Sequence, residues 1–296
     1  MNSILIYPRF RHMFWSFKYA LEVAGKQSAL PRLGLQTPIR APALMRLSVV
    51  NCRARMGVFV VQALFLLALT TTTQSAQGQT DPEKWLKEAE AAYGTVTNYV
   101  AIFHKQQRVG GKLLQEETIR IKFRKPFSLY MKWIAEPNKG SELLYVEGWN
   151  EDRARVHKGR WLRFIVRNLA PEDPQLMKNN LRPFTDTGIG FLVKTVAVNV
   201  RKAIKAGELS FYERGEETVY GRKTQRLEVV FPKEKAEDYD ACRLIINQDI
   251  ESKILVRIRM YDWGDQLSEN YGYEYLKLDA GLTDADFDPE NAAYHF

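Results

Sequence analysis

Side chains that could perform acid–base or metal chemistry are sparse in this sequence. Three of the four histidines lie beyond residue 79, at His104, His157 and His295, and none has a spacing typical of metal ligands. His104 and His157 fall in strand-like runs, where a solvated or hydrogen-bonded imidazole is expected. Cys242 lies in the strand-like run Ala241–Asn247, and we expect a buried structural thiol there. These residues predict no metal site and no cofactor.

Carboxylate pairs are common, but they fall in polar turns or on polar strand faces. Two carboxylates alone do not identify a reaction. The sequence also lacks the G-x-S-x-G, H-E-x-x-H and Ser-x-x-Lys patterns of hydrolases and any phosphate-binding glycine loop. We therefore predict no catalytic residues, with a secreted hydrolase kept as the second alternative. The pairs are Glu116–Glu117, Glu216–Glu217 and Asp286/Asp288.

Aromatic side chains are the more informative class. One interpretation is that they fill an ordinary core. The functional interpretation is that a large curled sheet leaves a cavity, whose aromatic wall would suit an acyl chain. Alternation also places Tyr271, Tyr273 and Tyr275 on one predicted face. The aromatic residues in predicted strands are Phe103, Phe123, Phe127, Trp133, Tyr145, Trp161, Tyr271, Tyr273 and Tyr275.

The strand pattern that must position these residues is clearest between Lys112 and Trp133. Its first half alternates apolar and basic side chains, the period-two signature of a half-buried strand. Pro126 removes a backbone donor and ends that strand. The alternation then resumes, so two antiparallel strands share one apolar face. That face consists of Ile119, Ile121, Phe123, Phe127, Leu129, Met131 and Trp133.

Two helices and one long loop accompany the strands. Asp81 is placed to cap a helix over 82–97, and Gly207 to end a largely apolar helix over 189–206. The Pro- and Asn-rich stretch 169–188 predicts a long loop with room for one helical turn. The remaining chain predicts about ten or eleven strands, too many for a flat sheet. We expect a mainly β fold, an unclosed antiparallel β-barrel with helices capping its concave face.

The positive charge of the chain is confined to its N-terminal part. The formal net charge is +8, and residues 1–80 contain nine Lys/Arg and one Asp/Glu, which accounts for the whole excess. The chain beyond residue 80 is neutral, so its charge indicates no nucleic-acid partner.

A secretory signal peptide is predicted over residues 56–78. Basic residues precede an apolar core, Gly57–Leu69, of 13 residues, which is short for a bilayer span but typical of a signal peptide. Small residues at Ala76 and Gly78 predict cleavage after residue 78, with cleavage after Ser75 or Ala76 as near alternatives. The rival interpretation of this segment is an uncleaved membrane anchor.

Residues 1–55 are predicted to be a disordered extension or the product of a start codon assigned too far upstream. Met1, Met45 and Met56 are the candidate starts. Cys52 precedes the apolar core, so it cannot be the lipidated residue of a lipoprotein, which would follow that core. We expect a periplasmic protein in which residues 79–296 form a single domain.

The order of elements resembles the periplasmic carriers and receptors of outer-membrane lipoproteins (LolA/LolB-like). Within that superfamily, the chain is similar to a branch of secreted bacterial proteins of unknown function. The resemblance covers residues 82–290 and rests on a helix, Tyr99-x-x-x-Phe103, Gly110–Gly111, a basic-Pro dipeptide before a strand ending in Trp, Glu147–Gly148 and a terminal D-A-D-F-D-P.

The resemblance implies an open barrel whose helix-capped concave face holds acyl chains. In the carriers an arginine before the proline helps to hold the lid, whereas here Lys125 stands there with Arg124 before it. Lysine offers a point charge in place of a planar fork. We expect both residues at the rim or lid, where they could meet an anionic head group. The expected cavity wall consists of Phe123, Phe127, Met131, Trp133 and Tyr145.

The predicted function is therefore a non-enzymatic carrier or receptor for a lipid or for the acyl group of a lipoprotein. It would contact a membrane only through its ligand or partner. Because fold alone does not determine function, the first alternative is an envelope scaffold that binds another protein and has a filled core.

Overall fold

The computed structural model describes residues 80–159 and 164–296, which lie in one compact unit, Thr73–Phe296. The extension predicted over 1–55 and the signal peptide predicted over 56–78 lie outside the described residues. Both therefore stay predictions.

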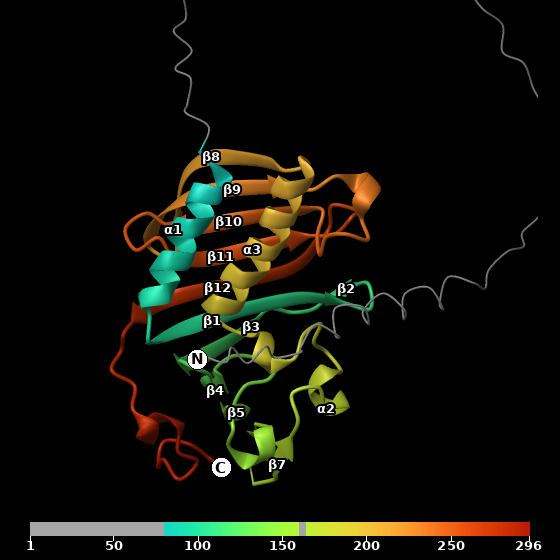
Figure 1. Ribbon diagram of the computed structural model, residues 1–296. Helices are drawn as coiled ribbons and strands as arrows, with labels where there is room; N and C mark the ends of the chain where they lie inside the picture. Colours follow the sequence, from blue (N-terminus) through green and yellow to red (C-terminus); the bar gives the residue numbers. More distant parts are fainter. Residues whose placement is uncertain (1–79, 160–163) are drawn as a thin grey trace, which may run out of the picture. The chain divides into compact units, whose positions relative to one another are not determined.

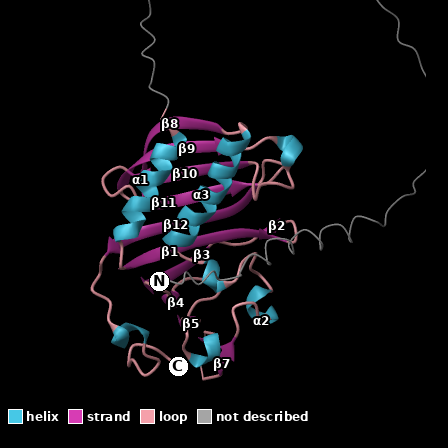
Figure 2. Ribbon diagram, in the orientation of Figure 1, coloured by secondary structure: helices cyan, strands magenta, loops and turns pink. Residues whose placement is uncertain are grey.

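The fold is dominated by one antiparallel sheet (Figure 1, Figure 2). The strands are β1 (Asn98–Val109), β2 (Lys112–Leu113), β3 (Glu117–Arg124), β4 (Ser128–Trp133), β5 (Glu142–Val146), β6 (Ala154–His157), β7 (Val166–Leu169), β8 (Ser210–Val219), β9 (Arg222–Val230), β10 (Arg243–Asp249), β11 (Leu255–Tyr261) and β12 (Leu267–Leu278). Their order is β7-β6-β5-β4-β3-β1-β12-β11-β10-β9-β8, and β2 pairs with β1 beside this path.

The sheet is unclosed. Among the described residues β7 pairs only with β6 and β8 only with β9, so the two edges do not meet. The eleven strands of the path and their antiparallel pairing confirm the predicted fold class.

The helices lie close to the predicted positions. They are α1 (Pro82–Thr95), α2 (Pro174–Met177) and α3 (Ile189–Ala206), with the 3₁₀ helices η1 (Asn150–Asp152), η3 (Phe184–Asp186), η4 (Lys233–Lys235) and η5 (Asp284–Phe287). The Asp81 carboxylate accepts a hydrogen bond from the Glu83 N–H at 3.0 Å and so caps α1. Gly207 ends α3 in the left-handed conformation, with φ of 69°.

Helices α1 and α3 pack against one face of the sheet, here called the helix-covered face; the opposite face is the outer face. Figure 1 shows both helices lying across the strands β8–β12. Leu86 of α1 and Val196 of α3 are fully buried together with Ile246 and Ile258 of the sheet. The apolar side of each strand therefore points toward the helices, as the alternation predicted.

One predicted position is wrong. Tyr271 and Tyr273 are buried on the helix-covered face, but Tyr275 is 75% exposed and has a left-handed φ of 51°. The β1–β12 register shifts between Val100 and Ile102, which places an extra residue in β12 near Tyr275. Such a bulge reverses the alternation of side chains, and strict period two could not predict it.

The chain after β12 packs on the outer face of β4 and β5. The Tyr294 ring stacks on Tyr130, with 3.9 Å between the ring centroids. Phe287 of η5 and Leu144 of β5 are buried in the same small apolar cluster. The C-terminal segment thus covers part of the outer face, the face opposite α1 and α3.

Glu142 is buried beside this cluster and holds several polar groups. It accepts a hydrogen bond from the Tyr130 hydroxyl at 3.0 Å and pairs with Lys132 Nζ at 2.8 Å. The imidazoles of His157 and His295 also face it, at 3.8 and 3.2 Å. Burial alone would raise the pKa of Glu142, but the nearby His157 imidazole, the Lys132 ammonium and the Tyr130 hydroxyl outweigh burial and lower it to about 2.

We predict that Glu142→Gln makes the protein less stable and less sensitive to acid. A carboxylate whose pKa is lowered by folding stabilises the protein above its unfolded pKa, and this contribution is lost as the pH falls from 4.5 toward 2. The expected loss at pH 7 is about 3 kcal/mol, measured by urea unfolding. The exposed Glu147→Gln is the control. Equal acid sensitivity of Glu142→Gln and the wild type between pH 4.5 and 2 would contradict the prediction.

Candidate functional site

A small cavity lies between the helix-covered face and residues 176–188, here called the lid segment. Its volume is about 90 Å³. Phe103, Met131, Trp133 and Leu143 line it from the sheet, and Phe184 and Leu192 line it from the lid segment and α3. The cavity is thus mostly apolar and aromatic.

At about 90 Å³, the cavity is smaller than a typical small-molecule pocket. Small-molecule pockets usually measure about 300–1,000 Å³. A ligand of that size could therefore enter only if the lid segment moved.

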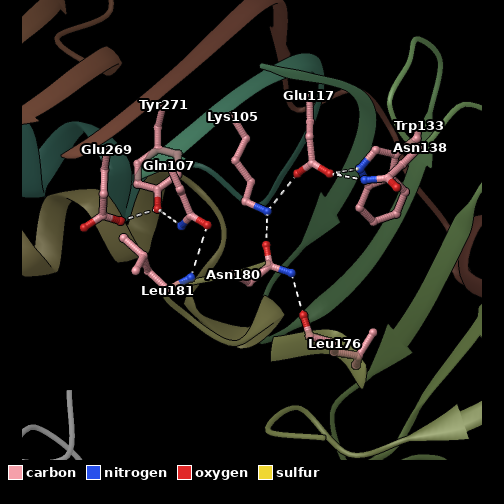
Figure 3. Close-up of polar contacts among 10 residues, drawn as sticks. All are labelled: Lys105, Gln107, Glu117, Trp133, Asn138, Leu176, Asn180, Leu181, Glu269 and Tyr271. Atoms are coloured by element: carbon pink, nitrogen blue, oxygen red, sulfur yellow. Dashed lines mark hydrogen bonds and ion pairs between the residues drawn. The ribbon is translucent and has the colours of Figure 1, made fainter. Parts of the chain in front are cut away.

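Polar side chains of β1 and β3 hold the middle of the lid segment (Figure 3). Lys105 Nζ donates to Asn180 Oδ1 and pairs with Glu117 at 2.9 Å. Gln107 Oε1 accepts a hydrogen bond from the Leu181 N–H at 3.2 Å. These bonds replace hydrogen bonds that the same groups would make with water if the segment lifted.

A charged pair holds the next residue of the lid segment. Arg182 donates two hydrogen bonds to the buried carboxylate of Glu269, both at 3.1 Å. The Tyr271 hydroxyl donates to Glu269 and accepts from Gln107 Nε2 at 2.5 Å. Burial disfavours the Arg182 charge, but Glu269 outweighs burial and raises the pKa of Arg182 above its usual range. The lid is therefore fixed at this point by a bidentate, partly desolvated contact.

The lid segment ends at Gly188, directly before α3. Gly188 has a φ of 111°, a conformation that L-residues rarely adopt, and a Cβ there would lie 3.0 Å from the Tyr99 hydroxyl. That hydroxyl accepts a hydrogen bond from the Ile189 N–H at 3.2 Å. Burial also raises the pKa of Asp186, two residues earlier, although Arg182 and Lys194 oppose this effect. The start of α3 is therefore tied to the centre of the sheet.

The predicted wall residues separate into two groups. Met131 and Trp133 line the cavity, and the Trp133 indole N–H donates to Glu117 at 3.1 Å. Phe123, Phe127 and Tyr145 do not border the cavity. They form a chain of edge-on ring contacts, at 5.3 Å from Phe123 to Phe127 and 5.8 Å from Phe127 to Tyr145.

This aromatic chain continues to the cavity through the lid segment. The Tyr145 ring meets Phe184 at 5.0 Å, and Phe184 lines the cavity. The five predicted residues therefore form one connected aromatic and apolar surface with the lid, of which only part is open space.

The two predicted rim residues have different surroundings. Arg124 pairs with Asp284 at 2.7 Å, so the C-terminal segment holds it and it does not reach the cavity. Lys125 Nζ donates to the carbonyl oxygens of Tyr93 at 2.8 Å and Gly94 at 3.2 Å. Lys125 thus fastens the end of α1 to the turn between β3 and β4.

Sequence reasoning missed the polar residues around the cavity. Lys105, Gln107, Asn180, Arg182 and Glu269 were not predicted. One signal for them was present, because alternation in β1 places Lys105 and Gln107 on the same face as Phe103. Polar residues at core-facing positions indicate a partner that must satisfy them.

His104 and Cys242, whose side chains could take part in acid–base or nucleophilic chemistry, are engaged in structural contacts. Both ring nitrogens of His104 face carboxylates, Glu116 at 3.0 Å and Glu274 at 2.9 Å. Cys242 is buried and donates through Sγ to the Asp262 carbonyl at 2.8 Å, and burial raises the pKa of its thiol. Within residues 80–159 and 164–296, no group of three His, Cys, Asp or Glu side chains could hold a metal ion.

In the part of the chain that is described, none of the helices combines the length and the apolar composition that a bilayer crossing needs.

Solved structures with a similar arrangement include proteins of the superfamily that the sequence resembles. The lipoprotein LppX of Mycobacterium tuberculosis matches at 14% identity over 71% of this chain and all (100%) of its own, with a TM-score of 0.43. The MucA/MucB complex of Pseudomonas aeruginosa matches at 14% identity over 71% of this chain and 61% of that chain, with a TM-score of 0.43. A LolA superfamily protein from Nitrosomonas europaea matches at 8% identity over 71% and 98%, with a TM-score of 0.30.

No curated protein matches the chain in sequence. One family model does match, described as "Protein of unknown function (DUF1571)", over residues 96–296. Because this match spans more than half of the 296 residues, the chain belongs to the DUF1571 family.

Proposed function

We propose that this protein is a non-enzymatic carrier or receptor that binds an acyl chain of a lipid or lipoprotein between the helix-covered face and the lid segment. The observation that supports it most directly is an apolar cavity beneath a segment held by polar contacts at its margin. The proposed place of action is the periplasm, reached through the signal peptide predicted over 56–78.

Such binding requires the lid segment to open, and the energies permit it. Neutral hydrogen bonds like that between Gln107 and Leu181 contribute about 0.5–1.5 kcal/mol each, and charged ones like Arg182–Glu269 about 1.5–3 kcal/mol. Burial of an acyl chain yields about 0.8 kcal/mol per CH₂, so about ten groups gain about 8 kcal/mol. A long acyl chain therefore offsets the free energy needed to break the hydrogen bonds that hold the lid segment.

Native mass spectrometry and lipid extraction of the protein, purified from periplasm without detergent, test the proposal. We expect a co-purifying lipid or acylated peptide. A protein that purifies bare and takes up no fluorescent fatty acid would contradict the carrier function. That outcome would favour the alternative, an envelope scaffold with a filled core.

We predict that Trp133→Ala weakens binding of a fluorescent fatty acid while destabilising the protein by less than about 3 kcal/mol, because Trp133 is half-buried at the cavity. The control is Trp149→Ala, since Trp149 is 36% exposed and does not line the cavity. Unchanged binding in Trp133→Ala, or an equal loss in Trp149→Ala, would exclude the cavity as the binding site.

We predict that Arg182→Gln loosens the lid segment. The change leaves Glu269 buried without its cation, which should cost about 3 kcal/mol or more and speed amide exchange over residues 176–188. The control is Arg201→Gln, because Arg201 pairs with Glu83 and Glu90 at a more exposed site, where the loss should stay below about 1 kcal/mol. If both variants exchange equally in the lid segment, Arg182 does not hold it.

A further inference from the structure

Three arginines gather on the outer face of the sheet, on the side away from the cavity. In the strand register, Arg226 of β9 and Arg257 of β11 both lie opposite Asn247 of the intervening β10. Arg259 of β11 lies opposite Ile245. Alternation places all three opposite the apolar side of their strands. Two strand spacings separate Arg226 from Arg257 by about 10 Å, and two residues separate Arg257 from Arg259 by about 7 Å. Three long side chains from these positions can converge on one point.

These arginines differ from their neighbours in having no carboxylate partner. Arg222 pairs with Asp249 at 3.4 Å, and Arg243 pairs with Asp265 at 2.6 Å. Among the described residues, Arg226, Arg257 and Arg259 form no ion pair; Arg257 Nε donates to the neutral Asn270 at 3.0 Å.

Carboxylates lie near the cluster without forming ion pairs with its arginines. Glu217 accepts a hydrogen bond from Asn247 Nδ2 at 3.1 Å. Glu116 accepts a hydrogen bond at 3.3 Å from Nδ2 of Asn270, the residue that Arg257 contacts, and Glu116 and Glu274 both face His104.

The cluster also holds buried donors that nothing accepts. Nε of Arg226 and Nε of Arg259 are enclosed and have no hydrogen-bond partner within the described part of the chain. The pKa of Arg259 is lowered by burial and then by the charges of Arg257 and Arg226. A set of like charges without paired carboxylates is unfavourable by itself and becomes favourable when an anion binds to the outer ends of the guanidinium groups.

We propose that Arg226, Arg257 and Arg259 bind a phosphomonoester group on the outer face, at a site separate from the cavity. A guanidinium group offers a planar fork that matches phosphate oxygens. A phosphomonoester carries about −1.5 to −2 charges at pH 7, so three guanidinium groups attract it more strongly than a monoanion. The group could belong to a small soluble metabolite or to a lipid head group, since both present the same oxygens.

Calorimetric titration with glycerol 3-phosphate, at constant ionic strength in chloride, tests the site. We expect saturable binding to the wild type and at least a tenfold loss of affinity in Arg259→Gln. The control is Arg120→Gln, because Arg120 lies exposed on the outer face of β3, also without an ion pair among the described residues, and its loss changes the net charge equally. Its affinity should stay within twofold of the wild type.

Vesicle flotation distinguishes the two sources of the phosphate. Binding to phosphatidic acid vesicles but not to phosphatidylcholine vesicles, lost in Arg259→Gln, would identify a head group. Binding of glycerol 3-phosphate alone would identify a soluble ligand. Binding to neither probe, or an equal loss in Arg120→Gln, would overturn the proposal.

A second variant keeps the test decisive if Arg259→Gln does not fold. Arg257→Lys retains the charge but removes the planar fork, so we expect a several-fold loss of affinity with little change in melting temperature. Full affinity in Arg257→Lys would show that only net charge attracts the anion, and would overturn the site.

Discussion

The pairing of β1 with β12 is the constraint on which the rest of the structure depends. These are the first and last strands in the chain, and they run side by side in the middle of the sheet, from Tyr99↔Leu278 to Gln107↔Glu269. Because β3 occupies the other edge of β1, and β11 that of β12, the two halves of the sheet grow outward in opposite directions. The chain therefore leaves the sheet at β7 and must re-enter it at the opposite edge, β8.

The lid segment and α3 are both parts of this long connection between the two edges of the sheet. A connection between opposite edges has to run over one face of the sheet, and here it carries residues 170–209 across the helix-covered face. The second half of the crossing is apolar and packs as α3. The first half carries Asn180 and Arg182, whose polar ends meet Lys105 and Glu269 at the margin of the cavity. A segment fastened by polar groups over an apolar surface can open with its freed groups in water, which a fully apolar segment could not do as easily.

The two faces of the sheet differ in how their polar and charged groups are partnered. The helix-covered face buries the main core, and most of its few polar groups have fixed partners. The outer face carries charges that mostly neutralise one another, such as Lys122 with Asp286 at 2.8 Å. Arg226, Arg257 and Arg259 depart from this rule, since they form no ion pair among the described residues, which is why we propose them as a binding surface.

Local sequence patterns were enough to predict the class of the fold, the helix over 189–206 and the apolar side of β3 and β4, because period-two and period-3.6 repeats involve only neighbouring residues. They also placed Met131 and Trp133 at the cavity. Long-range packing set the rest: Arg124 pairs with Asp284, a bulge turns Tyr275 outward, and Arg182 meets Glu269. These contacts join residues far apart in the chain, and strand register and the crossing connection bring them together. No local pattern encodes a register, so no local pattern could predict them.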